Sequence, residues 1–385
     1  MKKENLQLLC ACLAGFAFSA NYTNHAPLAA TLMEQFNFTK VMAGFLTTGI
    51  FTTHALMQIP AGHWADKFGG KKILIIALAI VCIGNIGIAF ATSYDQLLLW
   101  KIFVGFGTGA SFVSGARYIA QVMPARDLHR AQGYYGASVL LGSGFVIFAV
   151  PQIAGSFGWP ASFLTTAFVA VAVLLLWIFV APPASPVADP HTSLLSLLSH
   201  GQLWLLGFIQ MASFGLVIVI GSWITELLKT KVRLEPADAG MIGSLVLLLG
   251  IFTRIYGGLI IEKVGYRKLL VGSLLLIIAG CFILAMDNSS FVLAFAAIVL
   301  IGIGAGLPYS ALFNRAVALF PGRGGAAMGL VNMLGIIMIL GGAPLVGKIA
   351  DWTGSFSSAF ISLGIFAIAA LVASFGIKEK TFAKI

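Results

Sequence analysis

The chain has 385 residues, of which 59% are hydrophobic and only 9% are charged. With a mean hydropathy of +0.99, it has too little polar surface to cover a water-soluble globule of this size, so lipid must be the solvent for most of the chain. The net charge of +10 could suggest a nucleic-acid partner, but the basic residues lie in short loops between apolar segments. That placement argues against nucleic acid and indicates membrane topology.

Apolar segments of about 20 residues recur along the chain and are predicted to be spanning helices, because a helix satisfies its own backbone hydrogen bonds in lipid. The predicted spans, in chain order, are 6–32, 41–62, 71–92, 96–123, 131–152, 160–181, 203–227, 237–261, 268–286, 290–320, 324–347 and 355–377. The first resembles a signal peptide but is too long and lacks a small-residue cleavage pattern, so we expect it to remain as a helix. The predicted fold is an all-α membrane protein with twelve transmembrane helices.

Basic residues are distributed unevenly between the two sets of loops. The set on the same side as both termini holds most of the lysines and arginines, whereas the other set holds only Lys40, Lys229, Lys231, Arg233 and Lys348. Because positive charge resists translocation, the more basic side is predicted to be cytoplasmic. We therefore expect a multi-pass protein of a bacterial inner membrane with both termini in the cytoplasm.

The chain divides near its middle into two similar parts. A Pro- and Ser-rich stretch, 182–202, is interpreted as a cytoplasmic linker between a six-helix bundle in 1–181 and another in 203–385. The motif Gly62-His-Trp-Ala-Asp-Lys-Phe-Gly-Gly-Lys-Lys recurs 196 residues later from Gly258, and Gly105-Phe-Gly-Thr-Gly recurs 197 residues later from Gly302. Two unrelated motifs with nearly the same offset indicate a structural duplication.

These motifs resemble signatures of the major facilitator superfamily. The doubled loop motif is similar to that family's loop signature, and Lys101-x-x-x-Gly-x-Gly-x-Gly resembles its helix-4 signature, with Lys where Arg is usual. The likeness covers the whole chain. It implies two pseudo-symmetric halves that rock about a central cavity, lined mainly by helices 1, 4, 7 and 10, and so move a small solute by alternating access.

The loop motif also has a physical interpretation. Gly62 and Gly258 let neighbouring helices approach closely, while Asp66 and Glu262 lie at helix ends beside basic residues. Such a cluster can form a latch in one conformation and lose its partners in the other. The alternative is that these are solvated charges that only set orientation. The predicted latch residues are Gly62, Asp66, Lys67, Lys71, Gly258, Glu262, Lys263 and Arg267.

Arginines lie inside the predicted spans, where acidic residues are nearly absent. Arg117 and Arg315 lie roughly 9–12 Å from the predicted cytoplasmic ends, and each costs about 2.5–3.5 kcal/mol to insert unless something compensates it. Two guanidinium groups across a pseudo-two-fold axis would suit a carboxylate or another oxyanion. Alternatively, each side chain reaches toward the headgroups. Their repeat offsets differ by one residue, a rotation of about 100°, so the pair departs from strict symmetry.

Arg254 in the eighth span resembles the helix-8 arginine of superfamily members that carry oxalate, monocarboxylates or nitrate. At the equivalent turn of the second span, nitrate carriers have a second arginine, whereas this chain has Gln58. That departure argues against nitrate as the solute. Arg254 is predicted either to contact the substrate or to bind loop or backbone carbonyl groups.

The first span carries a polar cluster that includes Tyr22, Asn24 and His25. An amide, Asn21, stands where cation-exporting drug antiporters commonly have an acid, which disfavours cationic drug export. Because Pro27 frees a backbone carbonyl, this cluster can line a wet cavity. Further candidate substrate contacts are Tyr118, Tyr309 and Asn314, for which ordinary packing is the alternative.

Candidate coupling groups are the two histidines in apolar spans. His25 and His54 titrate near physiological pH and could carry a coupling proton, although an intramembrane histidine can also be a packing residue. Because the spans hold almost no acidic residue, sodium coupling is not expected. Proton symport, facilitated diffusion and anion exchange remain open.

The leading hypothesis is a secondary transporter of a small anion, such as an organic carboxylate. The alternatives are an exporter of a hydrophobic or amphiphilic compound and a non-transporting membrane receptor. No set of nucleophile, base and acid, no metal-ligand cluster and no phosphate-cradling loop is recognisable, so no enzyme activity, catalytic residue, metal or cofactor is expected. Cys10, Cys12, Cys82 and Cys281 lie in apolar runs and are expected to be buried thiols. A monomer in the bilayer is expected.

Overall fold

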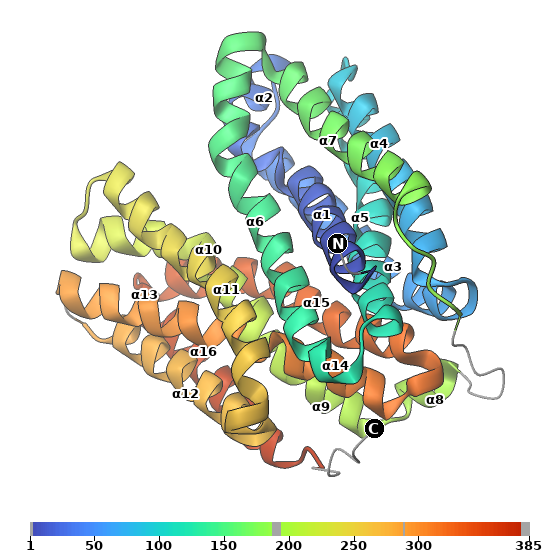
Figure 1. The fold of residues 1–385 in the computed structure, drawn as a ribbon. Helices are drawn as coiled ribbons and strands as arrows, with labels where there is room; N and C mark the ends of the chain where they lie inside the picture. Colours follow the sequence, from blue (N-terminus) through green and yellow to red (C-terminus); the bar gives the residue numbers. More distant parts are fainter. Residues whose placement is uncertain (1–2, 187–193, 288, 379–385) are drawn as a thin grey trace. The chain divides into compact units, whose positions relative to one another are not determined.

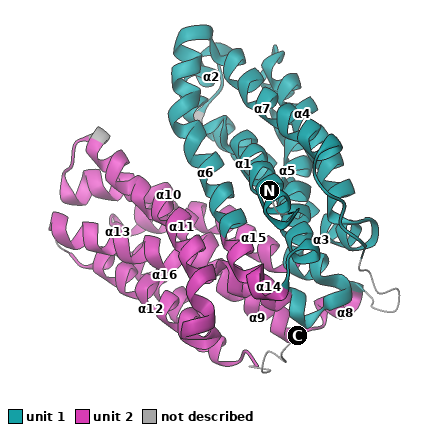
Figure 2. Ribbon diagram, viewed as in Figure 1, with its two compact units in different colours: residues 1–124, 134–194, 317–329 teal, residues 125–133, 195–316, 330–385 magenta. Residues whose placement is uncertain are grey.

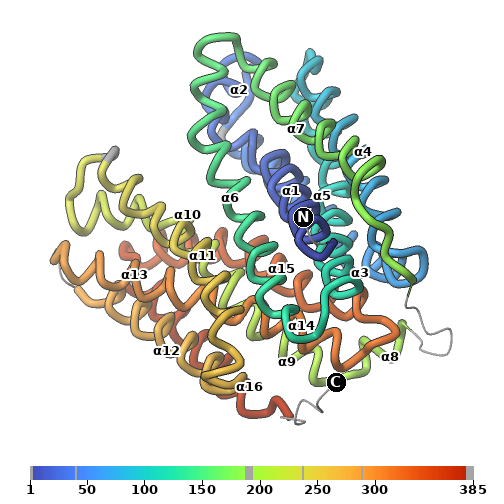
Figure 3. The backbone as a smooth tube through the Cα atoms, viewed as in Figure 1, coloured from blue at the N-terminus to red at the C-terminus, as the bar shows by residue number. Residues whose placement is uncertain are grey.

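The structure is a computed structural model that describes residues 3–186, 194–287 and 289–378 (Figure 1). Every regular element in these residues is a helix. The course of the backbone can be followed in Figure 3. The helices of the N-terminal half are α1 (Lys3–Thr23), α2 (Ala29–Phe36), α3 (Lys40–Phe68), α4 (Gly70–Ala89), α5 (Tyr94–Val122), α6 (Ala125–Phe157) and α7 (Trp159–Phe179). The later helices are α8 (Leu194–Leu198), α9 (Gly201–Gln210), α10 (Leu216–Leu227), α11 (Pro236–Val264), α12 (Tyr266–Ala285), α13 (Phe291–Gly306), α14 (Tyr309–Leu319), α15 (Gly324–Thr353) and α16 (Phe356–Phe375).

The prediction of twelve membrane-spanning helices is confirmed. Within the described ranges, eleven helical segments are long and apolar enough to cross a membrane, and α3, 29 residues long, is the twelfth. It contains polar residues such as Thr53, His54 and Gln58, which are buried in the protein and not exposed to lipid. The predicted linker lies partly outside the described residues, because 187–193 are not described.

Three spans are made of two helical segments each. The first contains a short 3-10 turn, Ala26–Leu28, with Pro27 in it, and α9 passes into α10 through a π-helical turn, Met211–Gly215. The break between α13 and α14 falls at Leu307-Pro308. Proline cannot donate to the helical ladder, and such interruptions are tolerated at membrane depth where protein surrounds them.

The two copies of the loop motif turn the chain in the same way. Gly69 ends α3 with φ +89°, and Gly265 ends α11 with φ +86°. A left-handed backbone of this kind strains any residue with a Cβ atom, so the glycine at this position of each copy is required by the turn. The next helix begins at the following residue, Gly70 or Tyr266.

The chain forms two compact units (Figure 2). Unit 1 contains residues 1–124, 134–194 and 317–329, and unit 2 contains 125–133, 195–316 and 330–385. The first residues of α6 therefore group with unit 2, and the first residues of α15 group with unit 1. Each unit has its own apolar core, for example around Ile50 and Phe163 in unit 1 and around Ile277 and Phe360 in unit 2.

Candidate functional site

The first copy of the loop motif contains a buried ion pair. Asp66, at the end of α3, is 0% exposed and Arg117 of α5 is 2% exposed, and the Arg117 Nε atom lies 2.6 Å from the Asp66 Oδ1 atom. The backbone N–H groups of Gly325 and Ala326, at the start of α15, donate to the same carboxylate at 2.9 and 3.2 Å. Asp66 thus binds a guanidinium group and the positive end of a helix dipole together, and both partners favour its negative charge.

Glycines allow α3 and α15 to approach closely at this point in unit 1. A Cβ atom on Gly62 would lie 2.2 Å from the carbonyl oxygen of Gly325, and one on Gly329 would lie 2.2 Å from that of Gln58. Since both obstacles are backbone atoms, a side chain at either glycine would push the two helices apart. Arg117 adds a third link, because its Nη2 atom donates to the Pro321 carbonyl oxygen at 3.1 Å.

The second copy of the motif keeps the close helix approach but not the buried ion pair. A Cβ atom on Gly258 would lie 2.4 Å from the carbonyl oxygen of His129, so α11 and the start of α6 touch in unit 2. Glu262 is exposed, unlike Asp66. At the repeat offset of 197, Asn314 corresponds to Arg117, and Asn314 pairs with the His129 ring at 2.9 Å. A neutral contact therefore stands where the first copy has an ion pair.

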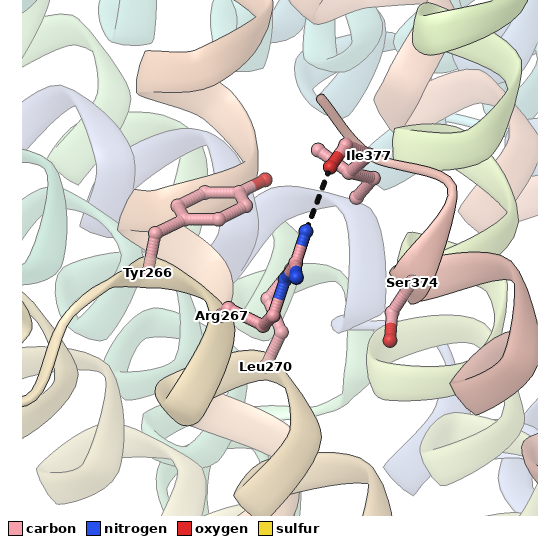
Figure 4. A pocket seen from close by; sticks show the side chains of 5 residues that line it. All are labelled: Tyr266, Arg267, Leu270, Ser374 and Ile377. Atoms are coloured by element: carbon pink, nitrogen blue, oxygen red, sulfur yellow. Dashed lines mark hydrogen bonds between the residues drawn. The ribbon is translucent and has the colours of Figure 1, made fainter. Parts of the chain in front are cut away.

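Lys71 and Arg267 hold equivalent positions in the two halves. The Lys71 Nζ atom donates to the carbonyl oxygen of Ala181, just after α7, at 2.6 Å. The Arg267 Nη2 atom donates to that of Ile377, just after α16, at 3.4 Å (Figure 4). Both pairs are related by the offset of 196, so each of these motif residues binds the carboxyl end of the last helix in its own half. The other motif lysines, Lys67 and Lys263, are exposed.

Tyr118 and Arg315 also contact the ends of these last helices. The Tyr118 hydroxyl donates to the Pro182 carbonyl oxygen at 2.8 Å, and the Arg315 guanidinium donates to the Lys378 carbonyl oxygen. Arg315 also lies over the ring of Tyr266, which faces Arg267 across the small pocket in Figure 4. Arg315 is thus the repeat partner of Tyr118 and not of Arg117, and the two arginines expected to form a matched pair bind different protein groups.

Arg254 lies among aromatic rings in unit 2. Its guanidinium carbon is 4.4 Å from the ring centroid of Tyr309 and 5.6 Å from that of Phe214, and the side chain is 5% exposed. Two of the predicted substrate contacts, Arg254 and Tyr309, are therefore adjacent. The equivalent residue in unit 1, Gln58, is also buried and donates to the carbonyl oxygens of His54 and Gly109, both at 3.3 Å.

The polar cluster of the first span contacts a buried lysine. The Lys101 Nζ atom donates to the Asn24 Oδ1 atom at 2.6 Å, and the Asn24 Nδ2 atom donates to Asn85 at 2.9 Å and to Thr166 at 2.8 Å. Lys101 is 1% exposed, and Asn24 and Asn85 are fully buried. This network joins α1, α4, α5 and α7, which pack side by side in unit 1 (Figure 1). Asn24 therefore makes internal hydrogen bonds that hold the helices together.

Tyr22 and His54 are adjacent in a second cluster of unit 1. Their ring centroids are 5.8 Å apart, Phe51 and Phe112 lie beside His54, and the His54 Nδ1 atom is 3.1 Å from the Thr108 hydroxyl. Tyr22 remains partly exposed. His25 lies apart from this aromatic cluster, with its Nε2 atom 2.9 Å from the Thr47 hydroxyl.

Buried charge in the described residues is strongly unbalanced. Asp66 is the only buried carboxylate among them, whereas the buried basic side chains are Lys101, Arg117, Arg254, Arg315 and Arg323. Asp66 is paired with Arg117. Because buried charge is costly in lipid, such side chains are kept inside a membrane protein only where other groups or a ligand compensate them.

Several residues of these clusters were not predicted as site residues. Lys101 and Asn85 are polar residues within apolar spans, and this signal could have identified them. Gly325 carries no such signal, because the group that it contributes is a backbone N–H. His129 contributes its ring to the contact with Asn314, but it lies before the predicted span 131–152 and so is not marked as a polar residue within lipid.

Comparisons with known proteins agree with this architecture. Residues 11–229 and 203–383 match the family model described as Major Facilitator Superfamily. The chain is 28% identical over 335 residues to "Probable nitrate transporter NarT" of Staphylococcus haemolyticus (strain JCSC1435), covering 86% of each chain. It is 26% identical over 383 residues to the protein of the same name from Staphylococcus carnosus (strain TM300), covering 98% of this chain and 97% of that one. It is 25% identical over 375 residues to "Probable nitrate/nitrite antiporter NarK1" of Thermus thermophilus, covering 88% of this chain and 84% of that one.

Solved structures show the same fold at low sequence identity. The human organic anion transporter MFSD10 matches with a TM-score of 0.82 at 15% identity, covering 97% of this chain and 100% of that one. The proton:xylose symporter XylE matches with a TM-score of 0.80 at 15% identity, covering 97% of this chain and 96% of that one.

Proposed function

The chain belongs to the major facilitator superfamily, and on that premise we propose that it moves a small anion across a bacterial inner membrane by alternating access. It is a multi-pass membrane transporter and not an enzyme. The relatives whose names mention nitrate or nitrite support an anionic solute. The proposed orientation, with both termini in the cytoplasm, rests on the uneven distribution of basic residues.

Arg254 is the proposed anion contact, and its burial carries the proposal. It lies ten residues before the end of α11, or roughly 15 Å from that end, within a membrane-spanning helix. The rings of Tyr309 and Phe214 lie beside the guanidinium group in cation–π contact, and a planar guanidinium group can bind an oxyanion through two parallel hydrogen bonds. A positive charge buried at this depth suits a negatively charged solute.

The proposed solute is a monovalent oxyanion, for which nitrate and nitrite are the first candidates. The names of the relatives favour these ions, whereas Gln58 in place of a second arginine disfavours nitrate. A single guanidinium group carries one positive charge, which matches a monovalent anion better than a divalent one. Small monocarboxylates therefore belong in the same panel.

Uptake by purified protein in liposomes tests this proposal. We expect Arg254→Gln to abolish uptake of the transported anion and Arg254→Lys to retain a small part of it, since lysine keeps the charge but not the planar fork. Arg126→Gln is the matched control, because Arg126 is exposed and pairs only with its neighbour Asp127 among the described residues. Wild-type uptake of a neutral amphiphile, with no anion in the panel transported, would overturn the proposal in favour of export of such compounds.

The Asp66 cluster is the proposed conformational latch. It joins α3 of the first sequence half to the start of α15 of the second half, and alternating access requires such contacts to be made and broken. We propose that Arg117 belongs to this latch and that Arg315 binds the end of α16. The two arginines then do not form the anion-binding pair that the sequence suggested. Glu262, being exposed, is assigned a weaker part in the second copy.

His54 is the proposed site of proton coupling, with His25 as the alternative. His54 lies beside Tyr22, which remains partly exposed. Glutamine is the substitution chosen for His54, because it is neutral and could still form a hydrogen bond with Thr108. We expect His54→Gln to abolish uptake driven by an imposed pH gradient while anion exchange continues. Gradient-driven uptake that survives in His54→Gln but fails in His25→Gln would assign the role to His25.

A further inference from the structure

An apolar groove opens between α3 and α4 in unit 1. It has a volume of about 350 Å³, and Trp64 and Phe68 of α3, Lys72, Ile76 and Ile80 of α4, and Ala110 of α5 are among the residues that line it. Trp64, Phe68 and Ile76 are exposed and form its walls, whereas Ala110 is buried and forms part of its floor. On a chain that spans a membrane, a groove with exposed apolar walls is bathed by lipid tails.

The groove has one charged end. Lys72 lies in the first turn of α4, and Ile80 lies eight residues further along the same helix, a distance of roughly 12 Å. Lys72 is exposed, and Trp64 and Phe68 of α3 line the groove with it. An ammonium group at the start of an apolar channel of this length has the layout of a lipid site, with the headgroup at the membrane interface and the chain in the hydrocarbon.

From this charge complementarity, we propose that the groove binds one anionic phospholipid. Its phosphate would pair with Lys72, and one acyl chain would lie against Ile76 and Ile80 over the alanine floor. The start of α4 adds a favourable helix dipole for the phosphate. Lys71, the neighbouring residue, is already bonded to Ala181, so Lys72 is the lysine of this turn that the lipid would engage.

The repeat restricts the site to the first half of the chain. At the offset of 196, Lys268 corresponds to Lys72, but Ile260, Val264 and Gly272 replace Trp64, Phe68 and Ile76. The second copy therefore retains the lysine and lacks the large walls. This difference provides an internal control, because a purely electrostatic attraction of lipid to the loops would involve both lysines equally.

Photo-crosslinking of the full chain tests the site independently of transport. The protein in lipid nanodiscs is exposed to phosphatidylglycerol with a diazirine in its acyl chain, or to phosphatidylcholine with the same label, and the labelled peptides are mapped by mass spectrometry. We expect phosphatidylglycerol to label 57–80 about five-fold more than phosphatidylcholine does, the factor expected for one lysine near an anionic headgroup. Lys72→Gln should remove that preference, and Lys268→Gln should not.

A groove-filling variant separates the acyl-chain contact from the charge contact. Ile80 is only partly buried, so Ile80→Trp should fill the groove without disturbing the core, and it should reduce labelling by both lipids. Equal labelling by the two lipids in the wild type, or an unchanged preference in Lys72→Gln, would overturn the proposal. The proposal would also be overturned if residues 57–80 were shielded from lipid labelling by residues 187–193 or by a second copy of the chain. A crosslink between residues 57–80 and either of these protein segments would show such shielding.

Discussion

The ammonium group of Lys71 donates a 2.6 Å hydrogen bond to the carbonyl oxygen of Ala181, 110 residues later in the chain. The same relationship joins Arg267 to Ile377 in the second half. The last carbonyl groups of a helix have no partner within it, and a positive charge there also offsets the helix dipole. The second basic position of the loop motif therefore stabilises the end of the last helix in each half.

Loss of this contact should lower the stability of the protein. We expect Lys71→Met to reduce the free energy of unfolding by about 1–2 kcal/mol, since a charge-assisted hydrogen bond is lost. Arg267→Met should cost less, because its bond is longer, at 3.4 Å. Thermal unfolding in detergent measures both, and Lys67→Met, at an exposed lysine of the same motif, is the control. If Lys67→Met and Lys71→Met lowered the free energy of unfolding equally, the contact between Lys71 and Ala181 would not contribute to stability.

The buried ion pair provides a second prediction. Asp66→Asn leaves the charge of Arg117 buried and uncompensated, which should destabilise the protein by about 3–5 kcal/mol. Adding Arg117→Met should recover part of this loss, because the unpaired charge is gone. The double-mutant cycle is measured by thermal unfolding, with uptake recorded in parallel. Strict additivity of the two substitutions would mean that the pair is not coupled.

Two glycines of α3 should respond oppositely to the same substitution. A methyl group on Gly62 would collide with the Gly325 backbone, whereas no atom lies within 4 Å of the position of a Cβ atom on Gly44. Gly62→Ala should therefore destabilise the protein by roughly 1–3 kcal/mol and reduce uptake. Gly44→Ala should instead stabilise α3 by roughly 0.5–1 kcal/mol, because alanine favours helix. Similar thermal unfolding curves for the two variants would contradict the close approach of α3 and α15.

The hydrogen-bond network around Lys101 should tolerate arginine at position 101 but not an apolar residue there. Lys101→Met leaves the buried Asn24 Oδ1 atom without its donor, at a cost of about 1–3 kcal/mol. Lys101→Arg restores a donor, and arginine is usual at this position of the helix-4 signature. Unfolding curves of both variants, with Lys263→Met as an exposed control, test this. A stable Lys101→Met protein with full uptake would rule out a structural role for the network.

The sequence alone determined the class of fold. Hydropathy and the spacing of apolar runs identified twelve spans, because lipid leaves a chain few ways to satisfy its backbone. The offset shared by Gly62 and Gly258 revealed the duplication. These signals are local, or they repeat along the chain, so no knowledge of packing was needed to interpret them.

The partners of the charged residues were decided only by the tertiary structure. Periodicity and depth made Arg117 and Arg315 look like a pair, but one meets Asp66 and the other a backbone carbonyl near the end of α16. A rotation of about 100° between adjacent helix positions is enough to redirect a side chain. The offset between repeats does not predict which side chain or carbonyl group lies next to a given arginine in the folded protein. A backbone carbonyl is present at every position and a backbone N–H at every position except proline, so groups such as the Gly325 N–H and the Ala181 carbonyl become specific partners only when helices pack.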